Sequence, residues 1–205
     1  MAVGVWLVFF SSVLAVTGVQ VRGTQVLTAH QVEAAATVPH DVPLATVDLS
    51  AIKARVEDLA PVRSADVSRS WPHSVLITVH ERQAVAFVAR NEGYQGVDQS
   101  GVLFRDYPQR PTGLPEIQMQ PATPVDALAE GAAVVASMPD ELVSKVAHVD
   151  VATIDNITLH LKSGATVTWG SADQSADKAR VLAVLLSQKA RTYDVTAPGH
   201  PTIRR

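Results

Sequence analysis

The stretch from Val62 to Ala86 constrains the fold of this chain more than any other part of the sequence. Small or β-branched apolar residues occupy every second position in two runs: Ala65 and Val67, then Val75, Ile77 and Val79. This alternation is typical of strands that bury one face. Pro72 lies between the two runs and lacks the amide that a sheet ladder needs. The sequence therefore predicts a β-hairpin with its turn at Trp71–His73.

The residues before this hairpin predict one strand and two helices. We expect the strand at Val19–Val26. Thr28 and Gln31 have the spacing of a capping box, which would open a short helix through Ala36. Asp48 can cap a second helix. The apolar residues of that helix fall on one face: Leu49, Ile52, Val56 and Leu59. Pro61 ends it, and the element order becomes β-α-α-β-β.

The segment from Ala2 to Val21 is almost entirely apolar. Twenty helical residues rise about 30 Å, which is enough to cross the hydrocarbon core of a bilayer. A buried core helix is disfavoured because the segment is hydrophobic all round. A cleaved signal peptide would need a basic start, and no Lys or Arg precedes Arg22. We therefore favour a membrane anchor over a signal peptide.

After the hairpin, the sequence predicts a meander of strands with two helices. The expected strands are 84–90, 94–97, 102–104, 146–152, 157–161 and 165–169. The expected helices are 125–138 and 176–189, the second with Val181, Leu182, Leu185 and Leu186 as its buried stripe. Glycine-containing turns join two of the strand pairs, at 98–101 and at 163–164. We expect 108–124 to be mostly loop.

The last stretch, Tyr193 to Ile203, has the pattern of a strand interrupted by Pro198 and Pro201. Prolines in strands are confined largely to sheet edges or bulges. Amide directions alternate along a strand, so prolines three positions apart remove donors on opposite sides. Tyr193–Ala197 is therefore the better template for an added strand. The alternative is a frayed C-terminal tail.

No group of residues in the sequence points to catalysis or to a cofactor. Ser50–Lys53 and Ser175–Lys178 match the S-x-x-K pattern of penicillin-binding enzymes, but no Lys-Thr-Gly or Ser-Asp-Asn element accompanies either match. The seven histidines lack metal-binding spacings, and the absence of cysteine excludes thiolate zinc sites and disulfides. A net charge of −3 without a Lys/Arg cluster argues against nucleic-acid binding. We expect no enzyme activity, no cofactor and no metal.

Several motifs resemble those of one known family. Val67-x-Arg69-x-Trp71-Pro72, Ile77-x-Val79 and Glu81-Arg82-Gln83 together resemble the hairpin that ends the POTRA domain of the FtsQ/DivIB cell-division proteins. Further matches are Val21-x-Gly23, Val32–Ala36, Pro43–Asp48, Pro61-Val62, Gly96–Asp98 and Gly101-Val102-x-Phe104. One departure is Ala84, where the family usually has proline. The resemblance covers most of the chain and is to the actinobacterial type.

The resemblance implies an α+β fold in three parts. These are an N-terminal transmembrane helix at 1–18, a POTRA domain at 19–84, and an FtsQ-type β domain at 85–205. In the POTRA domain two helices pack on one face of a three-stranded sheet, and in the β domain helices cover one face of antiparallel strands. The family also carries a cytoplasmic tail, and the positive-inside rule requires Lys or Arg before the membrane helix. We therefore expect this chain to begin inside a longer natural sequence.

The resemblance implies a non-enzymatic bitopic scaffold of the divisome, anchored in the cell membrane at the septum with its C-terminal domain outside the cytoplasm. Its expected partners are FtsB-like and FtsL-like bitopic division proteins, recruited by β-augmentation at the C-terminal edge strand. Other septal membrane proteins would contact the POTRA domain and the membrane helix.

The partner-binding residues that this family implies lie near the C-terminal end. They are Tyr193, Asp194, Val195, Thr196, Ala197, Pro198, Gly199, His200, Pro201 and Thr202, with Lys178 on the neighbouring helix. From the residues alone, a solvated surface position is the plainer interpretation of Lys178. Two alternatives to a scaffold remain. A POTRA-bearing secretion or assembly factor would need tandem POTRA units and a barrel, and a wall-modifying enzyme would need convergent reactive groups.

Overall fold

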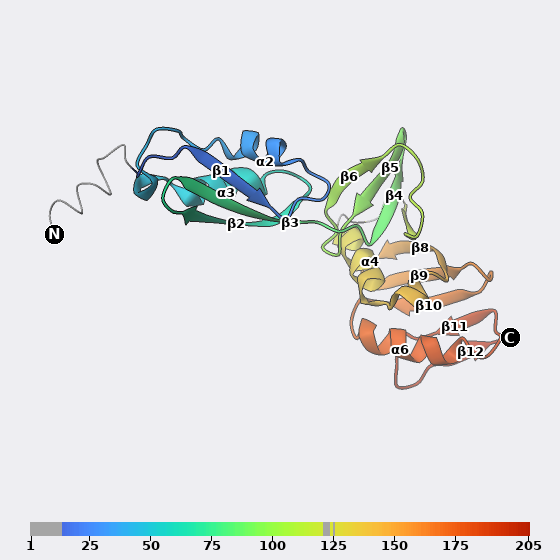
Figure 1. Ribbon diagram of the computed structural model, residues 1–205. Helices are drawn as coiled ribbons and strands as arrows, with labels where there is room; N and C mark the ends of the chain where they lie inside the picture. Colours follow the sequence, from blue (N-terminus) through green and yellow to red (C-terminus); the bar gives the residue numbers. More distant parts are fainter. Residues whose placement is uncertain (1–13, 121–123, 125) are drawn as a thin grey trace. The chain divides into compact units, whose positions relative to one another are not determined.

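The computed structural model describes residues 14–120, 124 and 126–205 (Figure 1). Contacts divide the chain into two compact units, one up to Arg82 and one from Gln83 onward. Each unit has a hydrophobic core of its own.

The first unit combines a small sheet with short helices. Its elements are β1 (Gly18–Arg22), α2 (Ala29–Ala36), the 3-10 helix η2 (Leu44–Thr46), α3 (Leu49–Glu57), β2 (Val62–Ser70) and β3 (Ser74–Glu81). The sheet order is β1-β3-β2, with β1 parallel and β2 antiparallel to β3. The predicted β-α-α-β-β order is therefore confirmed. Strand β1 ends at Arg22, earlier than expected, because Gly23 follows with a φ of 82°.

The hairpin of β2 and β3 has the predicted turn and the predicted buried face. Its register pairs Val67 with Ile77 and Ala65 with Val79, and the turn lies between Ser70 and Ser74. Of the apolar members of the alternation, Ala65, Val75, Ile77 and Val79 are buried and Val67 is half-buried, while the residues between them are more exposed. The same core contains residues from both helices: Val32, Ala36, Ile52 and Val56. The helices therefore cover the buried face of this sheet.

Both predicted helix caps are formed. The Thr28 hydroxyl accepts a hydrogen bond from the Gln31 amide at 3.3 Å, and the Gln31 side chain accepts one from the Thr28 amide at 2.9 Å. The Asp48 carboxylate accepts from the Ala51 amide at 3.0 Å. Hydrogen bonds from the Ala51 amide and the Ser50 hydroxyl lower the pKa of Asp48, because they favour its charged form.

Two charged residues of the hairpin motif hold neighbouring loops. Arg69 donates three hydrogen bonds to successive parts of one turn: Nε to Leu44 O at 2.8 Å, Nη2 to Ala45 O at 3.0 Å and Nη2 to Val47 O at 2.9 Å. The Glu81 carboxylate accepts hydrogen bonds from the amides of residues 25, 26 and 27, at 3.1, 2.8 and 2.9 Å. These residues of the family motif therefore tie loops to the sheet.

The predicted membrane helix falls mostly on residues 1–13, which lie outside the described part of the chain. Its last residues belong to the first unit: Ala15 forms a β-bridge with Pro43, and Val16 is fully buried in the core. The first unit thus begins earlier than predicted. Among the described helices, none has the length and apolar character needed to cross a membrane.

The second unit is built around one mixed sheet. Its elements are β4 (Ala86–Arg90), β5 (Gly93–Val97), β6 (Leu103–Tyr107), β7 (Glu116–Met119), α4 (Asp126–Ser137), α5 (Asp140–Val143), β8 (Val146–Thr153), β9 (Asn156–Leu161), β10 (Thr166–Gly170), α6 (Ser175–Leu185), β11 (Thr192–Asp194) and β12 (Thr202–Arg204). The described strands form a nine-stranded sheet in the order β12-β11-β10-β9-β8-β7-β4-β5-β6.

Strand β7 corrects the prediction that 108–124 is mostly loop. It pairs in parallel with β4 on one side and with β8 on the other, so it joins the two halves of the sheet. A four-residue strand among prolines carries little local signal, and its pairing with distant strands stabilises it. The short helix α5 was also not predicted.

Helices α4 and α6 pack on one face of this sheet. The buried cluster joins Leu128 and Val135 of α4 and Leu182 of α6 to Val149 and Trp169 of the strands. Val181, Leu185 and Leu186, predicted for the buried stripe of α6, are only partly buried against this core. The opposite face of β8–β11 carries the alternate, polar residues, as expected for a sheet that is covered on one side.

Candidate partner-binding edge of the second unit

The C-terminal margin of the large sheet differs from the prediction. Strand β11 is parallel to β10, and β12 folds back antiparallel to β11, pairing Thr192 with Arg204, Tyr193 with Ile203 and Asp194 with Thr202. Tyr193 and Asp194, the start of the expected template Tyr193–Ala197, therefore already lie between two strands, and the free margin is β12 (Figure 1). Pro198 and Pro201 lie in the connection between the two strands, where they interrupt no ladder. The local pattern could not reveal this reversal of the chain.

The directions of the backbone groups on β11 follow from two hydrogen bonds. The Val195 amide donates to Thr168 O at 3.0 Å, and the Thr166 amide donates to Arg191 O at 2.9 Å. Residues 191 and 195 thus direct backbone groups toward β10. Because directions alternate along a strand, residues 192 and 194 direct theirs toward β12.

The same alternation fixes which backbone groups of β12 point outward. Thr202 and Arg204 pair with the residues of β11 that face them, and the Arg204 carbonyl accepts from the Arg191 amide at 2.8 Å. Ile203 lies between them, so its N–H and C=O point away from β11. Pro201 has no amide hydrogen, so it offers only a carbonyl on that side. The free margin is short and centres on Ile203.

The predicted site residues divide into a buried set and an exposed set. Tyr193, Val195 and Lys178 are buried, and Asp194, Pro198 and Pro201 are half-buried. The exposed members are Thr196, Ala197, Gly199, His200 and Thr202. The Tyr193 hydroxyl donates to Gln188 O at 2.7 Å, which fixes it beneath the end of α6. The structure therefore brings together only the connection and the start of β12 as accessible surface.

Lys178 is not the solvated surface residue that the sequence suggested. Only 2% of it is exposed, and its ammonium donates to the Ser171 carbonyl at 2.9 Å. Burial lowers the pKa of Lys178, because removing water disfavours the charged form. Gly170, next to Ser171, lies against Thr196: a Cβ built on Gly170 would be 3.2 Å from Thr196 Cγ2. Lys178 thus holds a loop that touches the β11–β12 connection.

Ser175, the serine of the second S-x-x-K match, also forms hydrogen bonds that stabilise the fold. The Ser175 hydroxyl donates to Ala172 O at 2.7 Å and accepts from the Trp169 indole N–H at 3.1 Å. Trp169 is fully buried and packs in the core of the second unit, whereas Trp71 is 51% exposed. The two positions of the motif serve the packing of α6.

A hollow of about 620 Å³ lies between the end of α6 and the β9–β10 turn. Its apolar lining includes Leu161, Leu186 and Tyr193. Basic residues also line it: Lys145, Lys162, Lys189 and Arg191. This surface suits a partner that offers apolar and acidic side chains together.

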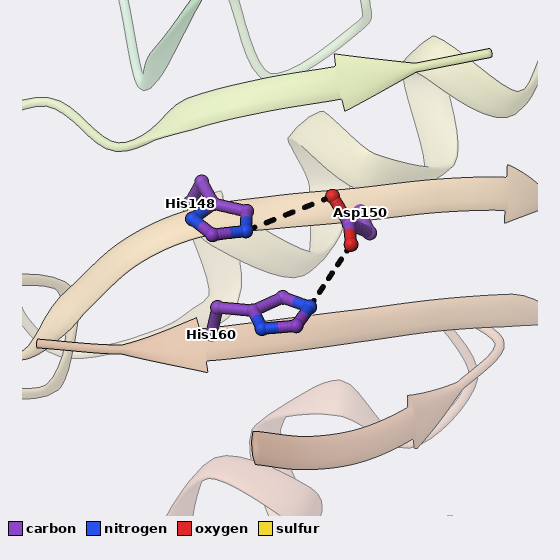
Figure 2. A group of neighbouring side chains, drawn as sticks. All are labelled: His148, Asp150 and His160. Atoms are coloured by element: carbon purple, nitrogen blue, oxygen red, sulfur yellow. Dashed lines mark ion pairs between the residues drawn. The ribbon is translucent and has the colours of Figure 1, made fainter. Parts of the chain in front are cut away.

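One cluster was missed by the sequence interpretation. His148, Asp150 and His160 bring two imidazole nitrogens and a carboxylate oxygen within 4.8 Å of one another on β8 and β9 (Figure 2). The search for H-x-H spacing could not find it, because the second histidine comes from the next strand. The available signal was His-x-Asp on one predicted strand and a histidine on the strand that pairs with it.

The comparisons with known proteins cover both units. Residues 14–82 match the family model described as POTRA domain, FtsQ-type, and residues 86–197 match the model described as Cell division protein FtsQ/DivIB, C-terminal. The major extracytoplasmic domain of the trans isomer of the cell division protein DivIB from Geobacillus stearothermophilus superposes with a TM-score of 0.40 at 18% identity, over 49% of this chain and 87% of that chain.

Two curated relatives span nearly the whole chain. Cell division protein FtsQ of Streptomyces bingchenggensis is 37% identical over 209 residues, which cover 97% of this chain and 79% of the relative. Cell division protein FtsQ of Streptomyces venezuelae is 38% identical over 209 residues, with 97% and 77% covered. Both the family models and these relatives agree, and the chain belongs to the FtsQ/DivIB family of bacterial cell division proteins.

Proposed function

We propose that this protein is a non-enzymatic scaffold of the divisome that recruits FtsB-like and FtsL-like bitopic partners by β-augmentation at β12. The family assignment supports a role in cell division, and the family is one of division scaffold proteins. The observation that carries the proposal is the outward N–H and C=O of Ile203 at the margin of the sheet. An extended partner segment would pair with these groups and complete the sheet.

The side chains around this margin give the added strand its selectivity. Ile203 is half-buried against the core of the second unit, while Thr202 and Arg204 are exposed. Residues paired across a sheet share a face, so a partner residue opposite Ile203 would extend the apolar face. The basic hollow lined by Lys189 and Arg191 favours an acidic residue nearby in the partner.

Lys178 acts in this proposal as a positioning residue. It is buried and cannot meet a partner directly. Its hydrogen bond to the Ser171 carbonyl fixes the loop that supports Thr196 and the β11–β12 connection. Replacing Lys178 would therefore affect a partner through the placement of β12.

The proposed location is the septal membrane, with both described units outside the cytoplasm and a single membrane segment before them. The family supports a membrane-associated division protein, and the apolar run at residues 2–13 would form part of that segment. Confinement to the same membrane raises the effective concentration of the partners. A short paired segment would then suffice for recruitment.

The test removes the outward amide and keeps the fold. In Ile203→Pro the lost N–H faces away from β11, so the pairing of β11 with β12 should survive. Ile203→Val keeps the amide and serves as the matched control. We expect Ile203→Pro to lose co-purification with the FtsB-like partner and Ile203→Val to retain it. A folded Ile203→Pro protein that recovers the partner as well as wild type would refute augmentation at β12.

A further inference from the structure

We propose that His148, Asp150 and His160 form a binding site for a divalent transition-metal ion such as Zn²⁺ on the open face of the large sheet. His148 and Asp150 are two residues apart on β8, so their side chains lie on the same face. His160 on β9 is the register partner of His148. Figure 2 shows both histidine rings and the carboxylate converging over these two strands.

The distances among the ligand atoms match the size of such an ion. His160 Nε2 lies 2.9 Å from Asp150 Oδ2, and His148 Nε2 lies 3.8 Å from Asp150 Oδ1. Tetrahedral Zn²⁺ with bonds of about 2.0–2.1 Å sets its ligand atoms about 3.3 Å apart. The two distances, which run to different oxygens of the Asp150 carboxylate, bracket that value, and one ligand atom from each residue lies within 4.8 Å of the others. Small side-chain movements would therefore close the site.

The two imidazole rings need one further adjustment. They are stacked, with centroids 4.3 Å apart and planes 10° from parallel. A metal bound by both rings requires their nitrogen lone pairs to meet at one point. Rotation about χ2 of each histidine, a soft torsion, turns the lone pairs together while the backbone stays in place.

The ligand set selects the kind of ion. Two imidazoles with one carboxylate suit Zn²⁺, Co²⁺, Ni²⁺ and Cu²⁺. Ca²⁺ and Mg²⁺ prefer sites made of oxygen ligands. Three protein ligands leave a fourth tetrahedral position for water or for a donor atom of a partner.

The surroundings keep the site accessible. The side chains of His148, His160 and Asp150 are 30%, 34% and 47% exposed, so an ion can enter from solvent. Their cross-strand neighbours on this face are Glu116, Gln118, Thr158 and Thr166. The Glu116 carboxylate forms an ion pair with Arg110 at 3.1 Å.

The chain contains a matched control on the sheet of the first unit. His80 Nε2 lies 3.1 Å from Asp66 Oδ2, again across two paired strands. Among the described residues, no third His, Cys, Asp or Glu lies close enough to this pair to complete a group of three metal ligands. The pair therefore reproduces the contact between His160 and Asp150 without the third ligand.

The experiment titrates the metal-free 205-residue protein, without a histidine tag, with Zn²⁺ by calorimetry and with Co²⁺ by visible absorption. We expect one site per chain and a tetrahedral Co²⁺ spectrum. Outer-shell changes alone cost roughly 10–100-fold in metal affinity, so His160→Ala and His148→Ala should each weaken binding at least tenfold. His80→Ala should bind as wild type. Far-ultraviolet circular dichroism checks that each variant is folded.

Two results would overturn the site. In one, the wild-type protein binds Zn²⁺ no more tightly than the folded His160→Ala variant, or neither protein binds the ion. The other is a loss in His80→Ala as large as the loss in His160→Ala.

Discussion

Replacing Arg69 by methionine should loosen the first unit far more than the same change at Arg55. Arg69 donates three hydrogen bonds to the turn at residues 44–47, whereas Arg55 donates one, from Nε to Ala36 O at 2.9 Å. Both residues are arginines of the first unit, and both donate hydrogen bonds to backbone carbonyl oxygens. The two variants therefore differ mainly in the number of hydrogen bonds that are lost.

The expected magnitudes follow from those bonds. A hydrogen bond to a charged group contributes about 1.5–3 kcal/mol to stability. These carbonyls are only partly buried and regain some water, so we take roughly 1 kcal/mol for each bond. Arg69→Met should then lower the opening free energy by about 3 kcal/mol and Arg55→Met by about 1 kcal/mol.

Native-state hydrogen exchange measures this opening for each unit separately. Amides of β3, in the centre of the first sheet, should exchange roughly 100-fold faster in Arg69→Met. Amides of β9 in the second unit provide an internal reference and should not change. If Arg69→Met and Arg55→Met speed the exchange of β3 amides equally, the three hydrogen bonds of Arg69 do not stabilise the first unit more than the single bond of Arg55.

Two further changes test the second unit. Gly101 has a φ of 79° and a Cβ there would lie 2.6 Å from Ala129 Cα, whereas Gly164 has a φ of 86° with open space around it. Left-handed backbone costs a residue other than glycine roughly 1–2 kcal/mol, so Gly164→Ala should lose about that much and Gly101→Ala clearly more. Equal losses of stability in the two variants, measured by hydrogen exchange of β9 amides, would show that a clash with α4 does not contribute. Lys178→Met tests how the buried ammonium changes the pH dependence of stability. Its folded pKa is below the ordinary value of 10.5, so the unfolded state binds more protons and wild-type stability rises as pH increases toward 10.5. Lys178→Met should lack this rise, the exposed control Lys189→Met should keep it, and urea midpoints between pH 7 and pH 10.5 measure it. A rise that persists in Lys178→Met would contradict the assignment.

The sequence was sufficient for the elements that carry their own signal. The alternation of Val75, Ile77 and Val79 gave the hairpin, because only a strand places every second residue in a core. Thr28 and Asp48 marked helix starts correctly, since capping depends on residues a few positions apart. The motif around Arg69 and Glu81 indicates the family from neighbouring residues alone, without the loops that these side chains hold.

The elements that depend on residues far apart in the chain could not be predicted from local sequence patterns. Strand β7 is stable only between β4 and β8. The free margin of the sheet is β12 and not the predicted template Tyr193–Ala197, because the chain reverses after Asp194 and pairs with itself. Lys178 looked like a surface residue, yet its burial depends on how α6 packs against the loop at Ser171.

The sequence by itself determined the family and the local structure whose period and caps depend on neighbouring residues. The tertiary structure alone decided which strand closes the sheet and which side chains meet across strands, as His148 and His160 do. The physical reason is range. Capping and alternation act within a turn or a strand, whereas strand order, burial of a charge and a metal-sized cluster arise from pairing between residues far apart in the chain.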